Sequence, residues 1–187
     1  MELLETFEGR CQCGEIRYRV AGETVALFIC HCRECQRQSA SAFGMALWLR
    51  NYCKNVLGGE LAAWTRTTPS GRQLIGEFCA RCGTRVFHQM TDQPGTMSIK
   101  AGTLDPAFDL EPVAQIWTSS ARSWVQLPTG ILSYPENPPT FDEIFAAWQS
   151  RKRYATLAGG APSPAGGVDA VACRRGSSRR ARRLEKE

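Results

Sequence analysis

The sequence predicts a mainly β domain of small antiparallel sheets, followed by one C-terminal helix and a disordered tail. Three observations support this prediction. Short apolar segments recur with turn residues between them, most cysteines lie in tight clusters, and one segment near residue 140 carries the start signals of a helix. The 187 residues are 43% hydrophobic and 22% charged, a composition that is sufficient for an ordinary globular core.

The strand pattern is clearest in GEIRYRV (14–20). Apolar residues at positions 16, 18 and 20 alternate with charged residues at 15, 17 and 19, which is typical of a half-buried strand. Glycines separate the other apolar segments, and this spacing favours small sheets over a βαβ repeat. Further strands are expected at 25–30, 44–50, 60–65, 73–79, 84–89, 96–101 and 113–118.

One helix is predicted after Pro138-Pro139. Thr140 is the expected N-cap, and Glu143 stands at the position that completes a capping box. The apolar stripe that follows indicates an amphipathic helix that closes the core; its members are Ile144, Phe145 and Trp148.

The composition changes after Tyr154. A Gly/Pro/Ala-rich stretch and then RRGSSRRARRLEKE follow, so we predict a folded body at 1–154 and a disordered basic tail at 155–187. The tail holds seven basic and three acidic residues and so accounts for +4 of the net charge of +5. The near-neutral body does not favour nucleic acid as its ligand, whereas the tail could contact nucleic acid or an acidic partner.

The cysteine usage indicates a reducing compartment. The N-terminal MELLETFEGR lacks the apolar region of a secretory signal, and no apolar run approaches the roughly 20 residues that span a bilayer. We therefore expect a cytoplasmic protein without a membrane partner. Clustered thiols in that compartment favour metal binding over disulfides.

Two cysteine pairs predict a four-cysteine metal site. The segments CQCG (11–14) and CARCG (79–83) each end in glycine, which accepts the positive φ of a tight metal-binding turn. Buried free thiols would explain neither the spacing nor the glycines. The site would tie the first strand to a central hairpin, and its predicted ligands are Cys11, Cys13, Cys79 and Cys82.

A second cluster lies in CHCREC (30–35), with predicted ligands Cys30, Cys32 and Cys35. Three protein ligands with an open fourth position are the usual arrangement of a catalytic zinc. In an extended segment, His31 would point away from the cysteines, and His88 is expected to be an ordinary strand histidine. A second structural zinc with an unidentified fourth ligand stays open as the alternative.

Three thiolates give a bound zinc an overall charge of −1. Such a site activates water poorly, yet an incoming thiol would lose its proton on binding and could then attack a small electrophile. The two isolated cysteines carry no metal prediction: Cys53 is expected to be a small buried hydrophobe, and Cys173 falls in the tail.

The cysteine segments resemble the glutathione-dependent formaldehyde-activating enzyme family. AGTLDP (101–106) and the pair Trp117 and Trp124 ahead of Leu127-Pro128 also resemble its pattern, which covers about residues 7–135. The resemblance implies a β-tent fold with a structural zinc on the four-cysteine site and a catalytic zinc on the three-cysteine site. It further implies a carbon–sulfur lyase that joins glutathione to formaldehyde and gives S-hydroxymethylglutathione.

Glutathione as co-substrate requires cations for its carboxylates. Arg33, Arg37 and Gln38 are the candidates, and Arg122 and Lys100 are further cations in the segments that the family pattern covers, although each alone could be a solvated surface charge. Glu34 would need a raised pKa to donate a proton, and solvent could supply that proton instead.

Two other functions stay open. The cysteine pattern also resembles centromere protein V-like proteins, so the chain could be a zinc-stabilised module that binds nucleic acid or protein. A thiol-dependent enzyme that acts on another electrophile, such as a different aldehyde or a halogenated compound, is the second alternative.

Overall fold

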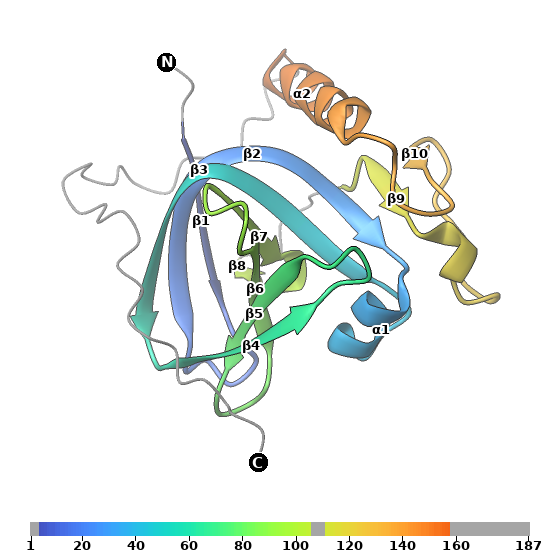
Figure 1. Ribbon diagram of the computed structural model, residues 1–187. Helices are drawn as coiled ribbons and strands as arrows, with labels where there is room; N and C mark the ends of the chain where they lie inside the picture. Colours follow the sequence, from blue (N-terminus) through green and yellow to red (C-terminus); the bar gives the residue numbers. More distant parts are fainter. Residues whose placement is uncertain (1–3, 106–110, 158–187) are drawn as a thin grey trace. The chain divides into compact units, whose positions relative to one another are not determined.

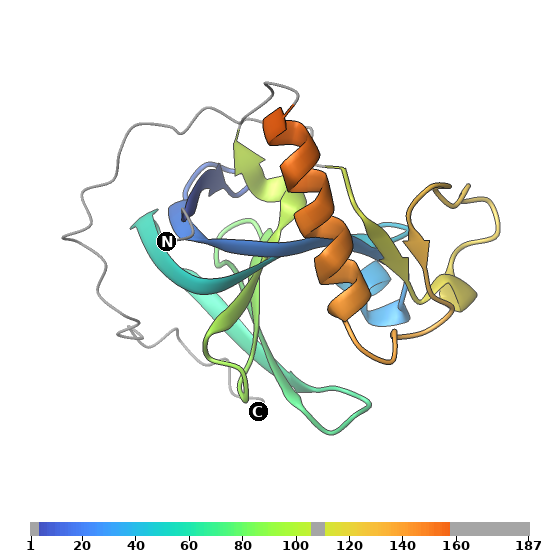
Figure 2. The same ribbon diagram turned by 90° about the horizontal axis from the view of Figure 1, so that it is seen from above.

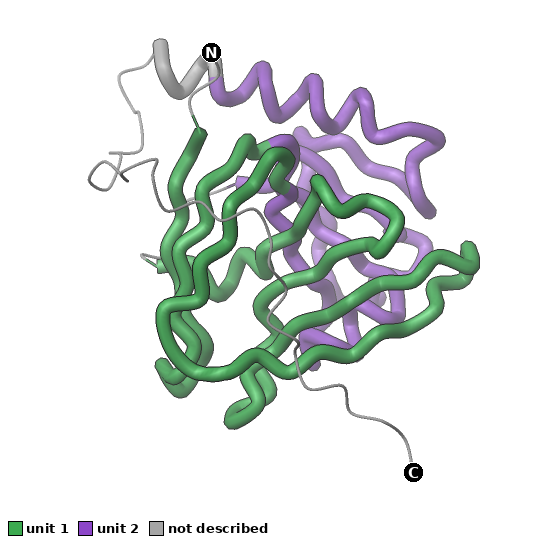
Figure 3. Tube along the Cα trace, turned by 60° about the vertical axis from the view of Figure 1, so that its left-hand side comes forward, with its two compact units in different colours: residues 1–24, 49–108, 164–187 green, residues 25–48, 109–163 purple. Residues whose placement is uncertain are grey.

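The computed structural model describes residues 4–105 and 111–157, with side chains as far as residue 152 (Figure 1). The chain forms two compact units, coloured separately in Figure 3. Unit 1 holds residues 4–24 and 49–105, and unit 2 holds residues 25–48 and 111–157. Strands β2 (Arg17–Cys30) and β3 (Gly44–Gly58) each run from one unit into the other.

Unit 1 is built from antiparallel strands. The N-terminal strand β1 (Glu5–Arg10) pairs with β2 along one edge and with the two-residue β8 (Leu104–Asp105) along the other. Four further strands form an antiparallel meander in which each pairs with the next, and the last of them also pairs with β3. They are β4 (Leu61–Thr67), β5 (Gln73–Cys79), β6 (Arg85–Met90) and β7 (Thr96–Lys100).

The core of unit 1 follows the predicted alternation of β2. Ile16, Tyr18 and Val20 are buried, whereas the charged residues between them are exposed. The Tyr18 ring meets the Phe87 ring edge to face at 4.8 Å, and the Tyr18 hydroxyl lies 2.7 Å from the hydroxyl of Thr103 in the 3₁₀ turn η1 (Ala101–Thr103). Such paired aromatic contacts add to the free energy that burial already provides.

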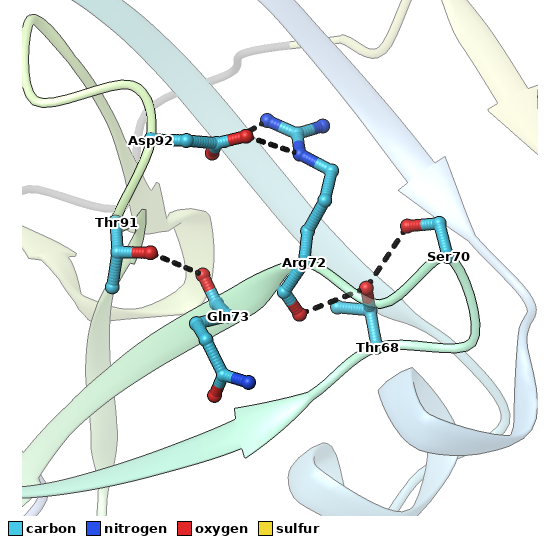
Figure 4. A network of polar contacts seen from close by, with 6 residues as sticks. All are labelled: Thr68, Ser70, Arg72, Gln73, Thr91 and Asp92. Atoms are coloured by element: carbon cyan, nitrogen blue, oxygen red, sulfur yellow. Dashed lines mark hydrogen bonds and ion pairs between the residues drawn. The ribbon is translucent and has the colours of Figure 1, made fainter.

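Polar contacts close the β4–β5 hairpin of unit 1 (Figure 4). The Arg72 guanidinium donates to both carboxylate oxygens of Asp92 at 2.8 and 2.9 Å. The Thr68 hydroxyl donates to the Arg72 carbonyl at 3.0 Å and lies 3.0 Å from the Ser70 hydroxyl. The bidentate ion pair joins the start of β5 to the turn that follows β6.

Unit 2 combines the end of β2 with two short parallel strands and two helices. β9 (Ala114–Ile116) runs parallel to β2, and β10 (Leu132–Ser133) runs parallel to β9; these two lie side by side in Figures 1 and 2. Helix α1 (Arg33–Ser39) follows β2 almost directly, the 3₁₀ turn η2 (Thr118–Ser120) follows β9, and helix α2 (Asp142–Leu157) ends the described chain.

Helix α2 begins near the predicted cap. The Asp142 N–H donates to the Thr140 hydroxyl at 3.4 Å, as an N-cap requires. The predicted role of Glu143 in a capping box is wrong, because its carboxylate instead accepts a hydrogen bond of 2.6 Å from the Tyr134 hydroxyl. On the predicted apolar stripe, Ile144 and Trp148 are buried.

The aromatic residues around α2 explain its position within unit 2. Phe141, just before the helix, lies 4.8 Å from Trp48 of β3 and 6.0 Å from Phe28 of β2, measured between ring centroids. Phe145 adds a stacked contact with Phe141 at 6.1 Å. Helix α2 thus covers an aromatic cluster, and this packing role agrees with the core-closing helix that the sequence predicted.

The predicted fold class is confirmed, with corrections to individual elements. The expected strands 14–20 and 25–30 form one strand, because β1 pairs with its first part and β9 with its last. The strand expected at 44–50 continues to Gly58, and a helix, α1, forms within the second cysteine segment. The predicted strand 73–79 has the bounds of β5.

The predicted boundary at Tyr154 lies within α2, which continues to Leu157. The rest of the predicted tail, including Cys173, lies outside the described residues. Within the described part of the chain, none of the helices combines the length and the apolar character that a membrane crossing demands.

Candidate functional site: two cysteine clusters and a cationic pocket

The first cluster brings together the four predicted cysteines of unit 1. Cys11 and Cys13 lie in the turn between β1 and β2, and Cys79 and Cys82 lie at the end of β5 and in the turn that follows it. Their four sulfur atoms lie within 4.8 Å of one another. The cluster therefore connects the first turn of the chain to the β5–β6 hairpin, as the spacing predicted.

The two cysteine turns share one hydrogen-bond pattern. The N–H of Cys11 donates to the Ile16 carbonyl and the N–H of Gly14 donates back to Cys11, both at 3.0 Å. The second turn repeats this with Cys79, Thr84 and Gly83 at 3.0 and 2.9 Å. Gly14 and Gly83 have φ of +76° and +73°, so the predicted left-handed glycines are confirmed.

The geometry of this cluster suits a tetrahedral metal ion. Zinc with Zn–S bonds of about 2.3 Å holds its sulfur ligands about 3.8 Å apart. The Cys13 and Cys79 sulfurs lie 3.8 Å apart, and the Cys11 and Cys13 sulfurs 3.4 Å apart. The Thr84 hydroxyl and N–H lower the pKa of Cys82 to about 5, which favours the thiolate form that metals bind. The donor set therefore fits zinc.

The second cluster lies in unit 2, where β2 gives way to α1. Cys30 is the last residue of β2, Cys32 caps the N-terminus of α1, and Cys35 is in its first turn. Their three sulfurs lie within 4.8 Å of one another. The Cys35 N–H donates to the Cys32 sulfur at 3.4 Å. The first turn of α1 therefore brings Cys35 back toward Cys30 and Cys32.

The protonation of this cluster is shared among its thiols. Hydrogen bonds from Cys30 and Cys35 lower the pKa of Cys32 to about 2, whereas hydrogen bonding with Cys32 and Cys35 raises the pKa of Cys30. Thiols this close together lose their protons as one coupled set rather than one by one. A soft metal ion would replace those protons, and three thiolates fit zinc.

No fourth His, Cys, Asp or Glu joins the three sulfurs among the described residues. His31, between two of the cysteines, is fully buried, with its ring 5.6 Å from the Phe43 ring. His88 lies in β6 of unit 1 and belongs to neither cluster, as predicted. A tetrahedral metal ion held by these three sulfurs would therefore have no fourth ligand of these residue types within the described part of the chain.

A pocket of about 620 Å³ lies within unit 2 and shares α1 with this cluster. Arg33 and Arg37 of α1 and Arg122 beyond η2 give it three cations, and Trp124, which is 75% exposed, contributes an aromatic surface. Gln36 fixes the wall of this pocket: its amide donates to the carbonyls of His31 at 2.6 Å and Ser120 at 2.9 Å. The remaining lining residues are Ala40, Ser41 and Ala42.

The other residues singled out from the sequence lie as follows. Gln38 does not line the pocket; its amide donates to the Cys35 sulfur at 3.4 Å. Glu34 accepts a hydrogen bond of 2.6 Å from Arg37. Lys100 lies on β7 in unit 1, and Cys53 is half-buried in β3 rather than buried.

Gln36 and Thr84 contribute to the site, and neither was predicted from the sequence. Thr84 directly follows CARCG, and this position could have indicated a residue that contacts the cysteine turn. Gln36 lacks such a signal, because its two partners are backbone carbonyls that only the folded chain brings together.

The sequence from residue 6 to residue 120 matches the family model described as glutathione-dependent formaldehyde-activating enzyme. The chain belongs to this family. The match includes all seven clustered cysteines and confirms the resemblance drawn from their spacing. It ends before Arg122 and Trp124, so these two pocket residues are features of this chain beyond the matched segment.

The formaldehyde-activating family is the most specific information that the comparisons provide. No curated protein matches the chain at a significant level. A crystal structure of a Rhodobacter sphaeroides protein is similar to it, with a TM-score of 0.43 and 18% sequence identity, over 68% of this chain and 98% of that chain.

Proposed function

We propose that this protein is a cytoplasmic zinc-dependent carbon–sulfur lyase that joins glutathione to formaldehyde and gives S-hydroxymethylglutathione. The observation that carries the proposal is the three-cysteine cluster, which has no fourth His, Cys, Asp or Glu among the described residues, in a chain of the formaldehyde-activating family. We assign a structural zinc to Cys11, Cys13, Cys79 and Cys82, and a catalytic zinc to Cys30, Cys32 and Cys35. When bound there, zinc would lower the pKa of a thiol ligand so that the thiol reacts as a thiolate.

The protein residues hold the thiol substrate in place. Arg33, Arg37 and Arg122 face one pocket, and guanidinium groups can each hold a carboxylate through two parallel hydrogen bonds. Glutathione has two carboxylates, which matches a pocket with more than one arginine. Cys35 belongs to the same short helix, α1, as Arg33 and Arg37, but it is not among the residues that line the pocket, so glutathione would have to extend beyond the pocket to place its thiol at the cluster.

Gln38 has a different role in this proposal from the one that the sequence suggested. Its amide N–H already points at the Cys35 sulfur, so it stabilises negative charge on that sulfur. Arg37 is partly neutralised by Glu34, which leaves Arg33 and Arg122 as the stronger candidates for glutathione carboxylates. We assign no acid within the protein to the final protonation, and solvent can supply that proton.

A titration of the cobalt-substituted protein with glutathione tests the proposal. Tetrahedral cobalt with thiolate ligands absorbs visible light according to its ligands, so a thiol that binds at the open position changes the spectrum. We expect the bands of one of two cobalt ions to change saturably. If the bands of both cobalt ions stay unchanged as glutathione is added, the result would contradict the proposal and favour two structural metals in a binding module.

Cys32→Ser is the variant that isolates the catalytic cluster. We expect it to lose the glutathione-dependent spectral change while its melting temperature stays close to that of the unmodified protein, because the four-cysteine cluster of unit 1 is intact. Arg122→Gln is the matched pocket variant and should weaken glutathione binding by about tenfold without changing the cobalt bands themselves. Unchanged thiol affinity in Cys32→Ser would contradict the assigned role.

A further inference from the structure

A group of cations lies on one face of the meander in unit 1, outside both cysteine clusters and outside the pocket. The strand register places Trp64 of β4, Gly76 of β5 and His88 of β6 in one row, with Ser98 of β7 opposite His88. Side chains opposite one another on adjacent strands share a face of the sheet. Gly76 therefore leaves a gap between the side chains of its two neighbours.

Two polar side chains converge on that gap. A Cβ atom added to Gly76 would lie 1.7 Å from a terminal nitrogen of Arg85 and 3.5 Å from Nε2 of His88. The Arg85 side chain thus extends into the space that a side chain at Gly76 would occupy. Its guanidinium carbon lies 5.2 Å from the centre of the Phe78 ring. The guanidinium group of Arg85 and Nε2 of His88 consequently lie near one point on the face of the sheet.

The His88 nitrogen lacks a partner. His88 is only 9% exposed, and its Nε2 is buried without a hydrogen bond among the described residues. A buried polar atom of this kind costs free energy unless another group satisfies it. Because the atom lies beside the Arg85 guanidinium, a ligand that accepts hydrogen bonds could satisfy both groups at once.

The charges around His88 have one sign. Burial and the positive charges of Lys100, Arg85 and Arg66 lower the pKa of His88, and burial and Arg66 also lower the pKa of Arg85. Neither Arg66 nor Arg85 forms an ion pair with any of the residues that the structure describes. Arg66 stands two residues beyond Trp64 on β4, and therefore on the same face of the sheet as Trp64 and His88. Repulsion between the half-buried guanidinium groups of Arg66 and Arg85 is destabilising, and an anion between them would reverse that effect.

We propose that Arg66, Arg85 and His88 form a binding site for a phosphate group in unit 1. The two guanidinium groups would each donate to phosphate oxygens, and the neutral His88 would donate through Nε2. Several convergent donors suit the dianionic phosphate better than a single carboxylate. Trp64, which is 45% exposed and next to Gly76 in the row, provides an aromatic surface for the organic part of a phosphate monoester.

NMR of the histidine rings tests this site directly, because the chain has two histidines, His31 and His88. The zinc-loaded full chain is titrated with inorganic phosphate at constant pH and ionic strength. We expect the ring signals of His88 to shift saturably and those of His31 to stay in place. If the shift of the His88 signals instead grows linearly without saturation, the phosphate is an adventitious ion only, and this result would overturn the proposal.

Three variants define the site. Arg85→Gln should weaken phosphate binding about tenfold or more, and Arg66→Gln provides the same test from a different strand if the first variant does not fold. Arg72→Gln is the matched control, because its guanidinium is held by Asp92 at 2.8 Å in the same unit, and it should bind phosphate unchanged. Equal losses in Arg85→Gln and Arg72→Gln would show a general charge effect and overturn the site.

Two further probes identify the source of the phosphate group. Tighter binding of phenyl phosphate than of inorganic phosphate, lost in W64L, would support a phosphate monoester with an organic part at Trp64. Equal binding of the two would support the same site with free phosphate as its ligand. Acetate binding more tightly than both would overturn the assignment to phosphate. None of these probes involves the cysteine clusters, so the result is independent of the glutathione proposal.

Discussion

His88 shows how strongly the surroundings of one residue decide its charge. Burial and the nearby cations lower its pKa to about 2, against an ordinary value of 6.5. The ring is therefore neutral in the folded protein at neutral pH. In the unfolded chain the same ring binds a proton below about pH 6.5.

This difference predicts a pH dependence of stability. Between pH 6.5 and the folded pKa, the unfolded chain binds one proton that the folded chain does not, so a falling pH favours unfolding. His88 should contribute a loss of about 1.4 kcal/mol in the free energy of unfolding for each pH unit below 6.5. Urea denaturation of the wild type and of His88→Gln between pH 7 and pH 4 measures it.

The test is the difference in stability between the wild type and His88→Gln at each pH. Protonation of the clustered cysteines would destabilise both proteins at low pH and so does not contribute to this difference. We expect the wild type to lose stability more steeply than His88→Gln, so that the two curves converge or cross as the pH falls. Parallel curves for the two proteins would show that the His88 ring is not held neutral by the fold.

At the scale of the element, α1 is the part of the site that the sequence analysis did not anticipate. The helix has seven residues and is capped by a cysteine sulfur, so it offers neither an apolar stripe nor a usual cap residue. Without α1, no distance between Gln38 and the Cys35 sulfur could be inferred. The cysteine turns of unit 1, by contrast, were predictable because glycine follows each pair at a fixed spacing.

The same contrast applies to the strands. β5 was predicted with its observed bounds, since glycine and polar residues flank a distinct apolar segment. β1, β8 and β10 were not predicted, because the sequence of β1 contains two acidic residues and because β8 and β10 are only two residues long. Tertiary pairing, which a local pattern does not contain, determined these elements.

Helix α1 ends in a strained residue, and this leads to a prediction. Ala40, its C-cap, has φ of 48° and ψ of 38°, the left-handed conformation that costs a non-glycine residue about 1 kcal/mol. Ala40→Gly should therefore raise the free energy of unfolding by about 0.5 to 1 kcal/mol, as measured by urea denaturation.

Ala42→Gly is the matched control for this prediction, because Ala42 lines the same pocket and does not have a positive φ. It should lower the stability by a similar amount, since glycine adds freedom to the unfolded chain without relieving strain. A loss of stability in both variants would mean that the strain at Ala40 is absent in solution.

At the scale of the whole molecule, the two cysteine clusters should contribute differently to stability. Cys79→Ser removes a ligand from the cluster that joins the β1–β2 turn to the β5–β6 hairpin. We expect it to lower the free energy of unfolding by more than about 4 kcal/mol, because a structural metal contributes directly to folding. Thermal and urea denaturation with zinc present measure the loss.

Cys32→Ser is the counterpart within the same chain, and its loss should be clearly smaller. Excess chelator should reduce the stability of the wild type to about that of Cys79→Ser and should have little further effect on that variant. A Cys79→Ser protein that unfolds like the wild type would contradict the structural role of the four-cysteine cluster.

The spacing of the ligands also fixes the order in which the two clusters can form on the ribosome. Cys30, Cys32 and Cys35 leave the exit tunnel within a few residues of one another, so a nascent chain could hold a metal ion there before strands β4 to β7 have been synthesised. The other cluster must wait until Cys82 has emerged, with its first two cysteines exposed throughout that interval. A metal ion at the three-cysteine cluster could consequently bind the unfolded chain as well, and it would then contribute little to the free energy of folding. The four-cysteine cluster could bind metal only after the chain up to β5 has been synthesised, whereas β6, β7 and β8 of unit 1 follow Cys82 in the sequence.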